Sequence, residues 1–115
     1  MSCLNPSSKV SPSLEVSCAI IEADGLVLAA RRGEQMAMPG KWEFPGGKLR
    51  PGESPVQGIV REIKEELDLK VQVQTGLEPC THNYPGLRVR LHPFVCWIVR
   101  GRVCLREHQE VCWIA

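Results

Sequence analysis

Three glutamates are the strongest candidates for chemistry in this sequence. Glu62, Glu65 and Glu66 stand at positions i, i+3 and i+4 of a segment with helical periodicity, so their carboxylates should be neighbours on one helix. Like charges at this spacing destabilise a helix by roughly 0.2–0.5 kcal/mol, and a helix C-terminus repels anions, so a cation should offset them. Arg61 and Lys64 could do this on an ordinary solvated surface. Mg²⁺ could also do it, because it binds carboxylate oxygens and bridges them to phosphates. The cluster alone leaves both interpretations open.

The helix that carries these glutamates is expected to start at Ser54. Ser54 is a predicted N-cap, Pro55 suits the first helical position, and Gln57 completes a capping box. Apolar residues recur at helical spacing in one stripe that must face the core: Val56, Ile59, Val60, Ile63 and Leu67. Glu66 lies at the border of this stripe and Glu65 lies opposite it. The glutamate side is therefore free for chemistry.

Short strands are expected on both sides of this helix. Val16–Ile21 and Leu26–Ala30 are apolar runs joined through Asp24-Gly25, a dipeptide that suits a two-residue hairpin turn. The segment Gly33–Gly52 is rich in Gly and Pro and predicts a loop, with a possible short strand at Lys41–Phe44. Later strands, with a turn at Gly101, are predicted at Lys70–Gln74, Arg88–Val99 and Glu110–Ile114. This order of elements predicts an α+β fold with a mixed sheet around one principal helix.

The composition indicates one globular domain. The 115 residues, 43% hydrophobic and 23% charged, fit a single compact unit preceded by a flexible tail at residues 1–14. The net charge is only +1, so the sequence does not indicate the strongly basic surface that binds a nucleic-acid polymer. No apolar run is long enough to span a membrane. We therefore expect a cytoplasmic protein that binds neither.

The six cysteines are expected to be reduced thiols, because they form no CxxC pair and no secretory signal precedes them. Cys104, His108 and Cys112 offer an alternative, a zinc site, since they stand at i, i+4 and i+8. The alternation of this segment favours a strand, which would separate the three side chains.

The context of the glutamates distinguishes a metal site from a solvated surface. Between Gly47 and Leu69 the sequence resembles the signature of the Nudix hydrolase family, GX5EX7REUXEEXGU, in which U is aliphatic. Six identities fit: Gly47, Glu53, Arg61, Glu62, Glu65 and Glu66. Both aliphatic positions fit as well, at Ile63 and Leu69. Asp68 stands where the family has glycine, so we expect a left-handed cap at some cost and a slightly altered helix exit.

The resemblance implies a fold and a metal site. The fold would be an α/β/α sandwich with a mixed β-sheet and one principal catalytic helix, in a domain that spans residues 15–115. The cofactor would be Mg²⁺, with Mn²⁺ as an alternative. Its ligands would be the Gly47 carbonyl and the carboxylates of Glu62, Glu65 and Glu66.

The resemblance also implies roles for residues around the metal. Glu53 would brace the loop against the helix, and Arg61 would orient a carboxylate. Glu107 resembles a loop position that often supplies a further acidic group in the family. The general base stays open among Glu62, Glu65 and Glu107.

The similarity from about Glu15 onward is closest to the MutT-like branch, which hydrolyses oxidised or otherwise noncanonical nucleoside triphosphates. The segments Arg31-Arg32 and Lys41–Lys48 resemble elements of that branch. They imply that Arg32 and Phe44 line the nucleotide site and that Lys48 lies near phosphate. A core position is the alternative for Phe44, since an aromatic residue in a strand is often buried.

The expected reaction converts a nucleoside triphosphate into a nucleoside monophosphate and pyrophosphate. An oxidised guanine nucleotide such as 8-oxo-dGTP is the first candidate substrate, and CTP or dCTP is the second. A nucleotide-binding module without turnover is the alternative from another class. In the MutT-like branch a helix after the last strand helps to form the base pocket, and this C-terminal helix is missing from the sequence. We therefore expect either a truncated chain or a pocket completed by another subunit, as a monomer or a homodimer.

Overall fold

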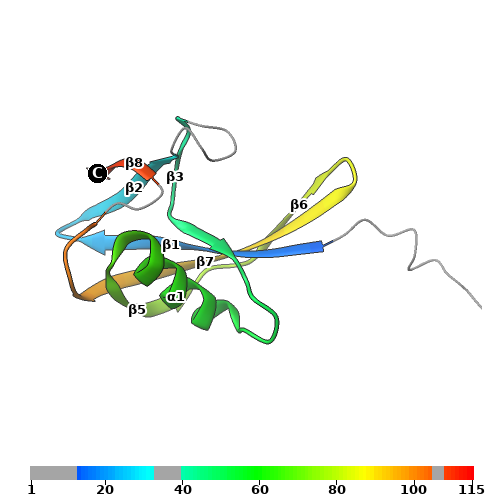
Figure 1. The fold of residues 1–115 in the computed structure, drawn as a ribbon, viewed down its shortest axis with the longest axis horizontal. Helices are drawn as coiled ribbons and strands as arrows, with labels where there is room; N and C mark the ends of the chain where they lie inside the picture. Colours follow the sequence, from blue (N-terminus) through cyan, green and yellow to red (C-terminus); the bar gives the residue numbers. More distant parts are fainter. Residues whose placement is uncertain (1–12, 33–39, 105–107) are drawn as a thin grey trace, which may run out of the picture.

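The fold is a mixed β-sheet with a helix packed against it. The computed structural model describes residues 13–32, 40–104 and 108–115. Its elements, drawn in Figure 1, are β1 (Ser13–Ala23), β2 (Leu26–Arg32), β3 (Trp42–Glu43), β4 (Gly46–Lys48), α1 (Pro55–Leu67), β5 (Lys70–Gly76), β6 (Cys80–Tyr84), β7 (Leu87–Arg100) and β8 (His108–Ile114). Within these ranges α1 is the only helix, which confirms the predicted α+β architecture with one principal helix.

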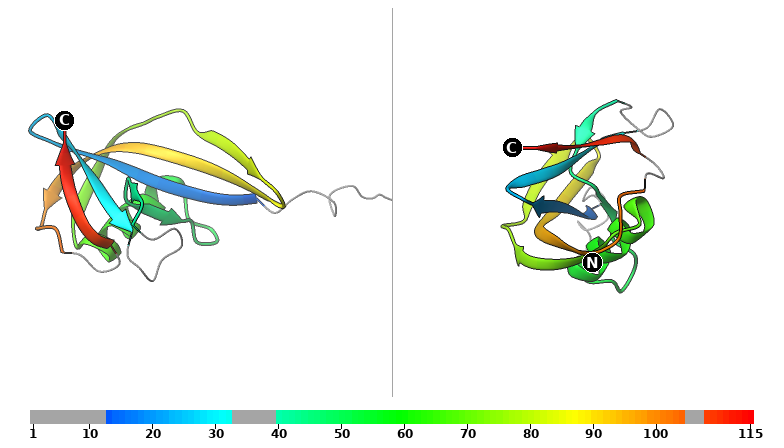
Figure 2. Two further views of the ribbon diagram at one scale, coloured as in Figure 1. Left: turned by 90° about the horizontal axis from the view of Figure 1, so that it is seen from above. Right: turned by 90° about the vertical axis from the view of Figure 1, so that its left-hand side faces the viewer.

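The long strand β1 organises the sheet. It runs parallel to β7 over ten paired positions, from Ser13 beside Arg88 to Glu22 beside Trp97. The order along the sheet is β3-β2-β1-β7-β5, while β4 pairs with β1, β6 with β7 and β8 with β2. All these other pairings are antiparallel, so the sheet is mixed, as predicted. Figure 2 shows β1 and β7 side by side along the molecule.

The first hairpin forms where the sequence predicts it. Asp24 and Gly25 have φ values of 52° and 77°, the left-handed values that a type I′ turn requires at both central residues. β1 begins earlier than predicted. Ser13 and Leu14, the last two residues of the predicted tail, pair with Arg88 and Val89 of β7 and so belong to the sheet. The rest of that tail, residues 1–12, lies outside the described residues.

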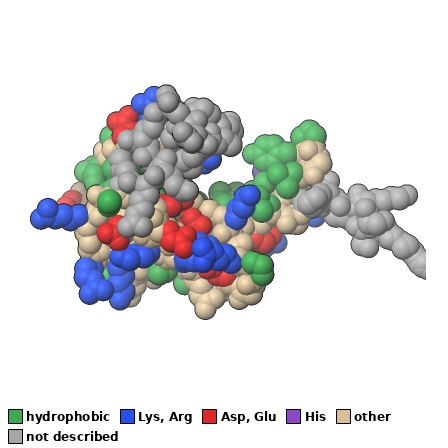
Figure 3. All heavy atoms as spheres, in the orientation of Figure 1, with side chains coloured by type: hydrophobic (Ala, Val, Ile, Leu, Met, Phe, Trp, Pro, Cys, Tyr) green, Lys and Arg blue, Asp and Glu red, His purple; other side chains and the backbone are tan. Residues whose placement is uncertain are grey.

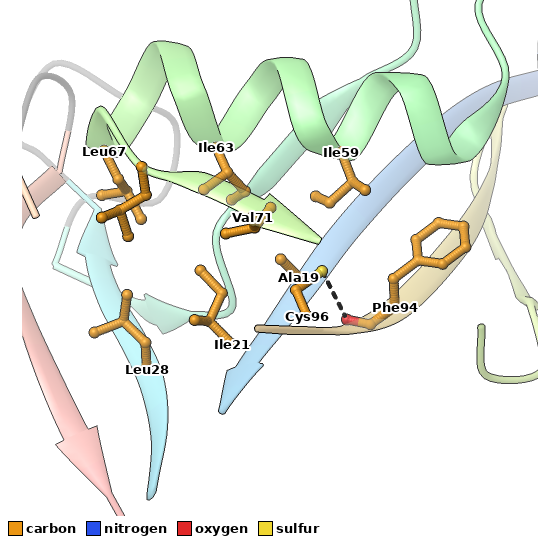
Figure 4. Packing of buried hydrophobic residues seen from close by; sticks show 10 residues of the cluster. Ala19, Ile21, Leu28, Ile59, Ile63, Leu67, Val71, Phe94 and Cys96 are labelled. Atoms are coloured by element: carbon orange, nitrogen blue, oxygen red, sulfur yellow. Dashed lines mark hydrogen bonds between the residues drawn. The ribbon is translucent and has the colours of Figure 1, made fainter. Parts of the chain in front are cut away.

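Helix α1 begins with the predicted capping box. The amide of Gln57 donates to Ser54 Oγ at 3.1 Å, and the Ser54 amide donates to Gln57 Oε1 at 2.9 Å. Ile59, Ile63 and Leu67 of the predicted stripe are fully buried. Figure 4 shows them pointing from the helix towards the strands. They complete a core with Ala19, Ile21, Leu28, Leu69, Val71, Phe94 and Cys96.

One residue of the predicted stripe is placed differently. Val56 is 44% exposed, although it shares the helical spacing of the buried residues. It lies in the first turn of α1, one turn before Ile59, which is the first apolar residue of the helix to reach the core. Periodicity predicts which face of a helix is apolar, but it does not predict how far along the helix the sheet extends.

Helix α1 ends at Asp68, which takes the left-handed conformation predicted for this position, with φ 56° and ψ 35°. Its amide donates to the Lys64 carbonyl at 3.1 Å. Its carboxylate Oδ1 lies 2.6 Å from Lys64 Nζ, an i,i+4 ion pair that offsets part of the conformational cost. Asp68 therefore caps the C-terminus of α1 in the place of glycine.

The strands after the helix confirm three predictions and add one element. β5, β7 and β8 cover the predicted strands at Lys70–Gln74, Arg88–Val99 and Glu110–Ile114. β6 was not predicted; it pairs with Leu87–Leu91 at the start of β7, and all five of its residues are exposed. Because β8 is a strand, the helical spacing on which the zinc alternative depended is not present. No helix in the described ranges is long and apolar enough to cross a membrane.

Candidate functional site

Six of the ten predicted site residues line one cleft of about 740 Å³: Arg32, Phe44, Gly47, Lys48, Glu62 and Glu66. Helix α1 contributes Glu62 and Glu66 to its lining, and β4 contributes Gly46, Gly47 and Lys48. The remaining polar lining is Ser17, Arg32 and Glu43, and the apolar lining is Leu14, Val16, Cys18, Phe44 and Leu91. Two smaller hollows, of about 360 and 320 Å³, contain none of the predicted site residues. The cleft is therefore the candidate site.

Two glycines let the strand β4 pass close to its neighbours. In β4, Gly46 pairs with Cys18 and Gly47 pairs with Ser17 of β1. A Cβ on Gly46 would collide with the Ser17 carbonyl oxygen, and a Cβ on Gly47 would lie 2.5 Å from the Glu62 carboxyl carbon. Only a residue without a side chain fits at either position. The Gly47 backbone and the Glu62 carboxylate are thereby in direct contact.

Arg61 connects the carboxylates of this region. Its Nε and Nη2 donate to the two Glu53 carboxylate oxygens at 2.6 and 2.9 Å. Its Nη1 donates to Glu62 Oε1 at 2.9 Å and to Glu65 Oε1 at 3.0 Å. Nη2 also donates to the Lys48 carbonyl at 3.1 Å. One guanidinium, whose side chain is 17% exposed, thus ties β4, the following loop and α1 together.

Glu53 connects the loop before α1 to the helix through its hydrogen bonds with Arg61. Hydrogen bonds from Arg61, and then from the Arg50 amide, lower the pKa of Glu53 from 4.5 to about 2. The same pair with Glu53 raises the pKa of Arg61 above its usual value. Both groups are therefore charged at any physiological pH, and the ion pair fixes the orientation of the guanidinium.

The three glutamates of the cluster are not equivalent. Glu66 is 6% exposed, and the Glu62 side chain is 15% exposed; both line the cleft. Glu65 is 47% exposed, does not line the cleft, and also accepts a hydrogen bond from Arg50 Nη2 at 3.0 Å. Of the three glutamates expected to converge, Glu62 and Glu66 line the cleft together with Gly47, and Glu65 does not. Figure 3 shows acidic and basic side chains interleaved on the face that carries α1.

The cleft contains the donors that a hard divalent cation prefers. Carboxylate and carbonyl oxygens are the usual ligands of Mg²⁺, which keeps several waters and so needs few protein ligands. Glu62, Glu66 and the Gly47 backbone supply such oxygens to the lining of one cleft, and the Glu62 carboxylate occupies the place where a Cβ on Gly47 would lie. In the described ranges no group of three or more His, Cys, Asp or Glu side chains is already gathered for a metal ion. The donor set fits Mg²⁺, with Glu65 still held outside the cleft by its two arginines.

The residues predicted to contact the nucleotide also line the cleft. Phe44 is 40% exposed, so it is not the core residue of the alternative interpretation. Lys48 is exposed on β4. Arg32 Nη1 donates to both carboxylate oxygens of Glu43, at 2.9 and 3.0 Å. Glu107 lies outside the described residues.

Sequence reasoning missed three polar residues of this region. Glu43 sits between Trp42 and Phe44, and only the strand register that places it beside Ala30 brings it to Arg32. Arg50 lies in a variable position of the signature and gave no signal. Nothing in the sequence distinguishes Ser17 from the other residues of its strand, although it is fully buried and lines the cleft.

The family model described as the NUDIX domain matches residues 12–114. The chain belongs to the Nudix family. Among Nudix relatives, the CTP pyrophosphohydrolase of Escherichia coli (strain K12) is 38% identical over 100 residues, which are 87% of this chain and 74% of that protein. The 8-oxo-dGTP diphosphatase of Proteus vulgaris is 39% identical over 69 residues, 60% of this chain and 62% of that protein.

Solved structures show the same Nudix fold. The MutT protein from Methanosarcina mazei Go1 superposes with a TM-score of 0.81 at 29% sequence identity. The match covers 91% of this chain and 78% of that one. The mixed sheet with α1 against it is thus the architecture of a Nudix hydrolase.

Proposed function

We propose that this Nudix chain hydrolyses a nucleoside triphosphate to a nucleoside monophosphate and pyrophosphate with the help of Mg²⁺. The observation that carries the proposal is the direct contact of Glu62 with Gly47 in the cleft that Glu66 and Phe44 also line. Carboxylates that hold a cation, next to an aromatic wall, suit a substrate with both a polyphosphate and a base.

The acidic lining provides the chemistry of phosphoanhydride cleavage. When bound, Mg²⁺ neutralises phosphate charge and lowers the pKa of a bound water. Glu62, Glu66 and the Gly47 carbonyl would hold it, together with Glu65 from the same helix. In the reaction the water oxygen bonds to phosphorus, the bridging P–O bond breaks, and pyrophosphate leaves. A carboxylate takes the proton of the water, and Glu62, Glu65 and Glu107 are the candidates for this base.

The surrounding residues orient the reacting groups. Arg61, held by Glu53, fixes one oxygen of Glu62 at 2.9 Å and so limits how that carboxylate can turn. Lys48 on β4 supplies a positive charge to the cleft, where it would attract the phosphates. Mn²⁺ would replace Mg²⁺ at the same oxygens, since both are hard cations that accept carboxylate ligands.

The nucleobase would lie against the apolar lining. Phe44 offers a ring face for stacking, and Arg32 with Glu43 offers both donors and acceptors to the edge of a base. An oxidised guanine nucleotide is our first candidate, supported by relatives named for 8-oxo-dGTP. CTP or dCTP is the second, supported by the relative named for CTP.

A pyrophosphate-release assay tests the proposal. The purified chain is incubated with Mg²⁺ and a panel that contains 8-oxo-dGTP, dGTP, CTP, dCTP and the other common triphosphates. Selective release from one of them is the expected outcome and identifies the substrate. Binding across the panel with no release from any member would overturn the proposal in favour of a nucleotide-binding module without turnover.

A further inference from the structure

Ser17 is a buried polar residue that the proposed reaction does not yet use. It lies in the middle of β1, is fully buried, and lines the cleft together with Glu62 and Glu66. Its hydroxyl oxygen makes no hydrogen bond to any residue in the described part of the chain. A buried hydroxyl without a partner destabilises a fold relative to alanine, so its presence here requires an explanation.

The register of β1 and β4 shows where the Ser17 side chain points. Ser17 is paired directly with Gly47 across the two antiparallel strands. Residues paired in this way project their side chains to the same face of the sheet, with Cβ positions about 4.5–5.5 Å apart. The Cβ position of Gly47 points into the Glu62 carboxylate, 2.6 Å from Oε2. Ser17 therefore projects towards the same carboxylate from the neighbouring strand.

The alternation along β1 gives the same orientation. Ala19 and Ile21, two and four residues after Ser17, point towards Ile59 and Ile63 of α1 (Figure 4). Since side chains of a strand alternate between faces, Ser17 belongs to the face that α1 covers. It is the buried polar residue of this row, at the level of the strand where β4 joins β1.

The Glu62 carboxylate has an oxygen available for such a donor. Its Oε1 accepts from Arg61 Nη1, whereas Oε2 accepts no hydrogen bond from a described residue. We propose that the Ser17 hydroxyl is a positioning group that donates a hydrogen bond to the Glu62 carboxylate when a divalent cation is bound. The inference rests on the proposed function, because it concerns the same acidic lining.

The Ser17 hydroxyl is expected to affect protein stability and cation affinity in opposite directions. Without the cation the hydroxyl is buried without a partner and lowers the stability of the protein. With the cation it holds a carboxylate in one orientation and strengthens cation binding, as groups that support a metal ligand do. Replacing Ser17 with alanine should therefore stabilise the cation-free protein and weaken cation binding at the same time. A purely structural serine would not give this pair of opposite changes.

The test compares Ser17→Ala with the unaltered protein and with Cys96→Ala. Cys96 is a fully buried small residue of β7 that does not line the cleft, so its replacement controls for general effects of core substitution. Mn²⁺ affinity is measured by electron paramagnetic resonance of the free ion, and the melting temperature is measured in EDTA. Ser17→Ala should raise the Mn²⁺ dissociation constant roughly tenfold. It should also raise the melting temperature by about 4 °C. Cys96→Ala should lower the melting temperature and leave Mn²⁺ affinity unchanged.

Other outcomes would each overturn an identified claim. An Mn²⁺ affinity in Ser17→Ala within twofold of the unaltered protein removes the positioning role and leaves the proposed function intact. A lower melting temperature of Ser17→Ala in EDTA shows that the hydroxyl serves the cation-free fold, which also contradicts the proposal. Absence of Mn²⁺ binding by the unaltered protein overturns both this inference and the proposed metal site. Ser17→Thr keeps the hydroxyl, and recovery of Mn²⁺ affinity in that variant is the expected confirmation.

Discussion

At the scale of single residues, Glu65 shows how surface ion pairs can restrain a carboxylate that we propose as a metal ligand. Arg61 and Arg50 hold its carboxylate outside the cleft that Glu62 and Glu66 line. Both contacts are exposed or partly exposed, so they contribute at most about 1 kcal/mol each to stability. A divalent cation that gathers the three carboxylates has only this weak restraint to overcome.

Replacing Glu65 by glutamine tests its proposed place among the ligands. Glu65→Gln should lower Mg²⁺-dependent pyrophosphate release more than about 100-fold, since even residues that only support a ligand cost 10- to 100-fold. The free energy of unfolding should change by less than about 1 kcal/mol, because the lost pairs are exposed. Steady-state kinetics and urea unfolding measure the two effects.

Glu78→Gln is the matched control for this variant. Glu78 is an exposed glutamate between β5 and β6 and forms no ion pair with a described residue. Its replacement should leave both the rate and the stability unchanged. Equal activity of Glu65→Gln and Glu78→Gln would exclude Glu65 from the metal site.

The pair of Glu53 with Arg61 predicts a dependence of stability on acid pH. The pKa of Glu53 is about 2 in the folded protein against 4.5 for the free group, so folding favours the ionised form. Its contribution is therefore complete above pH 4.5 and is lost as the pH falls through about 2. As the pH is lowered from 4.5 to about 2, the free energy of unfolding of Glu53→Gln should fall less than that of the unaltered protein. Urea unfolding at fixed ionic strength, with EDTA present, measures both. Parallel curves for the two proteins would contradict the pairing.

At the scale of elements, both ends of α1 are determined by local sequence. Ser54, Pro55 and Gln57 predict its start, and the structure forms each of the expected contacts. Asp24-Gly25 likewise predicts the first hairpin from two residues. Such signals can be read from the sequence because every group that takes part lies within a few positions of the others.

The C-terminal end of α1 allows a prediction for Asp68→Gly, which introduces the glycine of the family signature. Asp68 is left-handed, a conformation that costs non-glycine residues roughly 1–2 kcal/mol, less for Asp than for most. Its i,i+4 pair with Lys64 returns about 0.3–0.5 kcal/mol. Asp68→Gly should therefore stabilise the protein by about 0.5 kcal/mol, measured by urea unfolding.

Asp68→Asn separates the two contributions. Asparagine keeps a tolerance for the left-handed conformation and removes the charge that pairs with Lys64. This variant should be slightly less stable than the unaltered protein. Both variants lack the ion pair, so the difference between them measures the backbone contribution. If Asp68→Gly were no more stable than Asp68→Asn, the left-handed conformation would not limit stability at the helix exit.

The strand β6 shows where local patterns stop being informative. All of its residues are exposed, so no alternation of buried and exposed side chains marks Cys80–Tyr84 in the sequence. It exists because β7 offers a row of backbone partners from Leu87 to Leu91. The unequal burial of Glu65 and Glu66 has a similar cause, since the position of β4 and β1 relative to α1 decides which glutamate faces the cleft.

At the scale of the whole molecule, the cleft depends on contacts between distant segments. The parallel pairing of β1 with β7 joins residues that are about 75 positions apart, such as Ser17 and His92. Pairing of β4 with β1 then places Gly47 next to Ser17, and both line the cleft with Glu62. The resemblance to a family predicts which residues gather. The residue pattern alone does not, because no local preference encodes a pairing over this distance.

This assembly predicts that a divalent cation stabilises the entire fold. Because Gly47 lies on β4 and the glutamates lie on α1, a cation bound between them links the sheet to the helix in the folded state only. At a Mg²⁺ concentration 100 times the dissociation constant, the gain is about 2.7 kcal/mol, which corresponds to a rise of about 10 °C in melting temperature.

Calorimetric melting over a Mg²⁺ series, with the unaltered protein and with Glu62→Gln, measures this gain. Glu62→Gln removes a carboxylate charge from the contact with Gly47, so the rise in melting temperature should largely disappear. Asp68→Gly, whose substitution lies outside the cleft lining, should keep the full rise from a higher starting temperature. An equal rise in Glu62→Gln would mean that Mg²⁺ stabilises the fold from another position, because the link between β4 and α1 cannot form at full strength without that carboxylate.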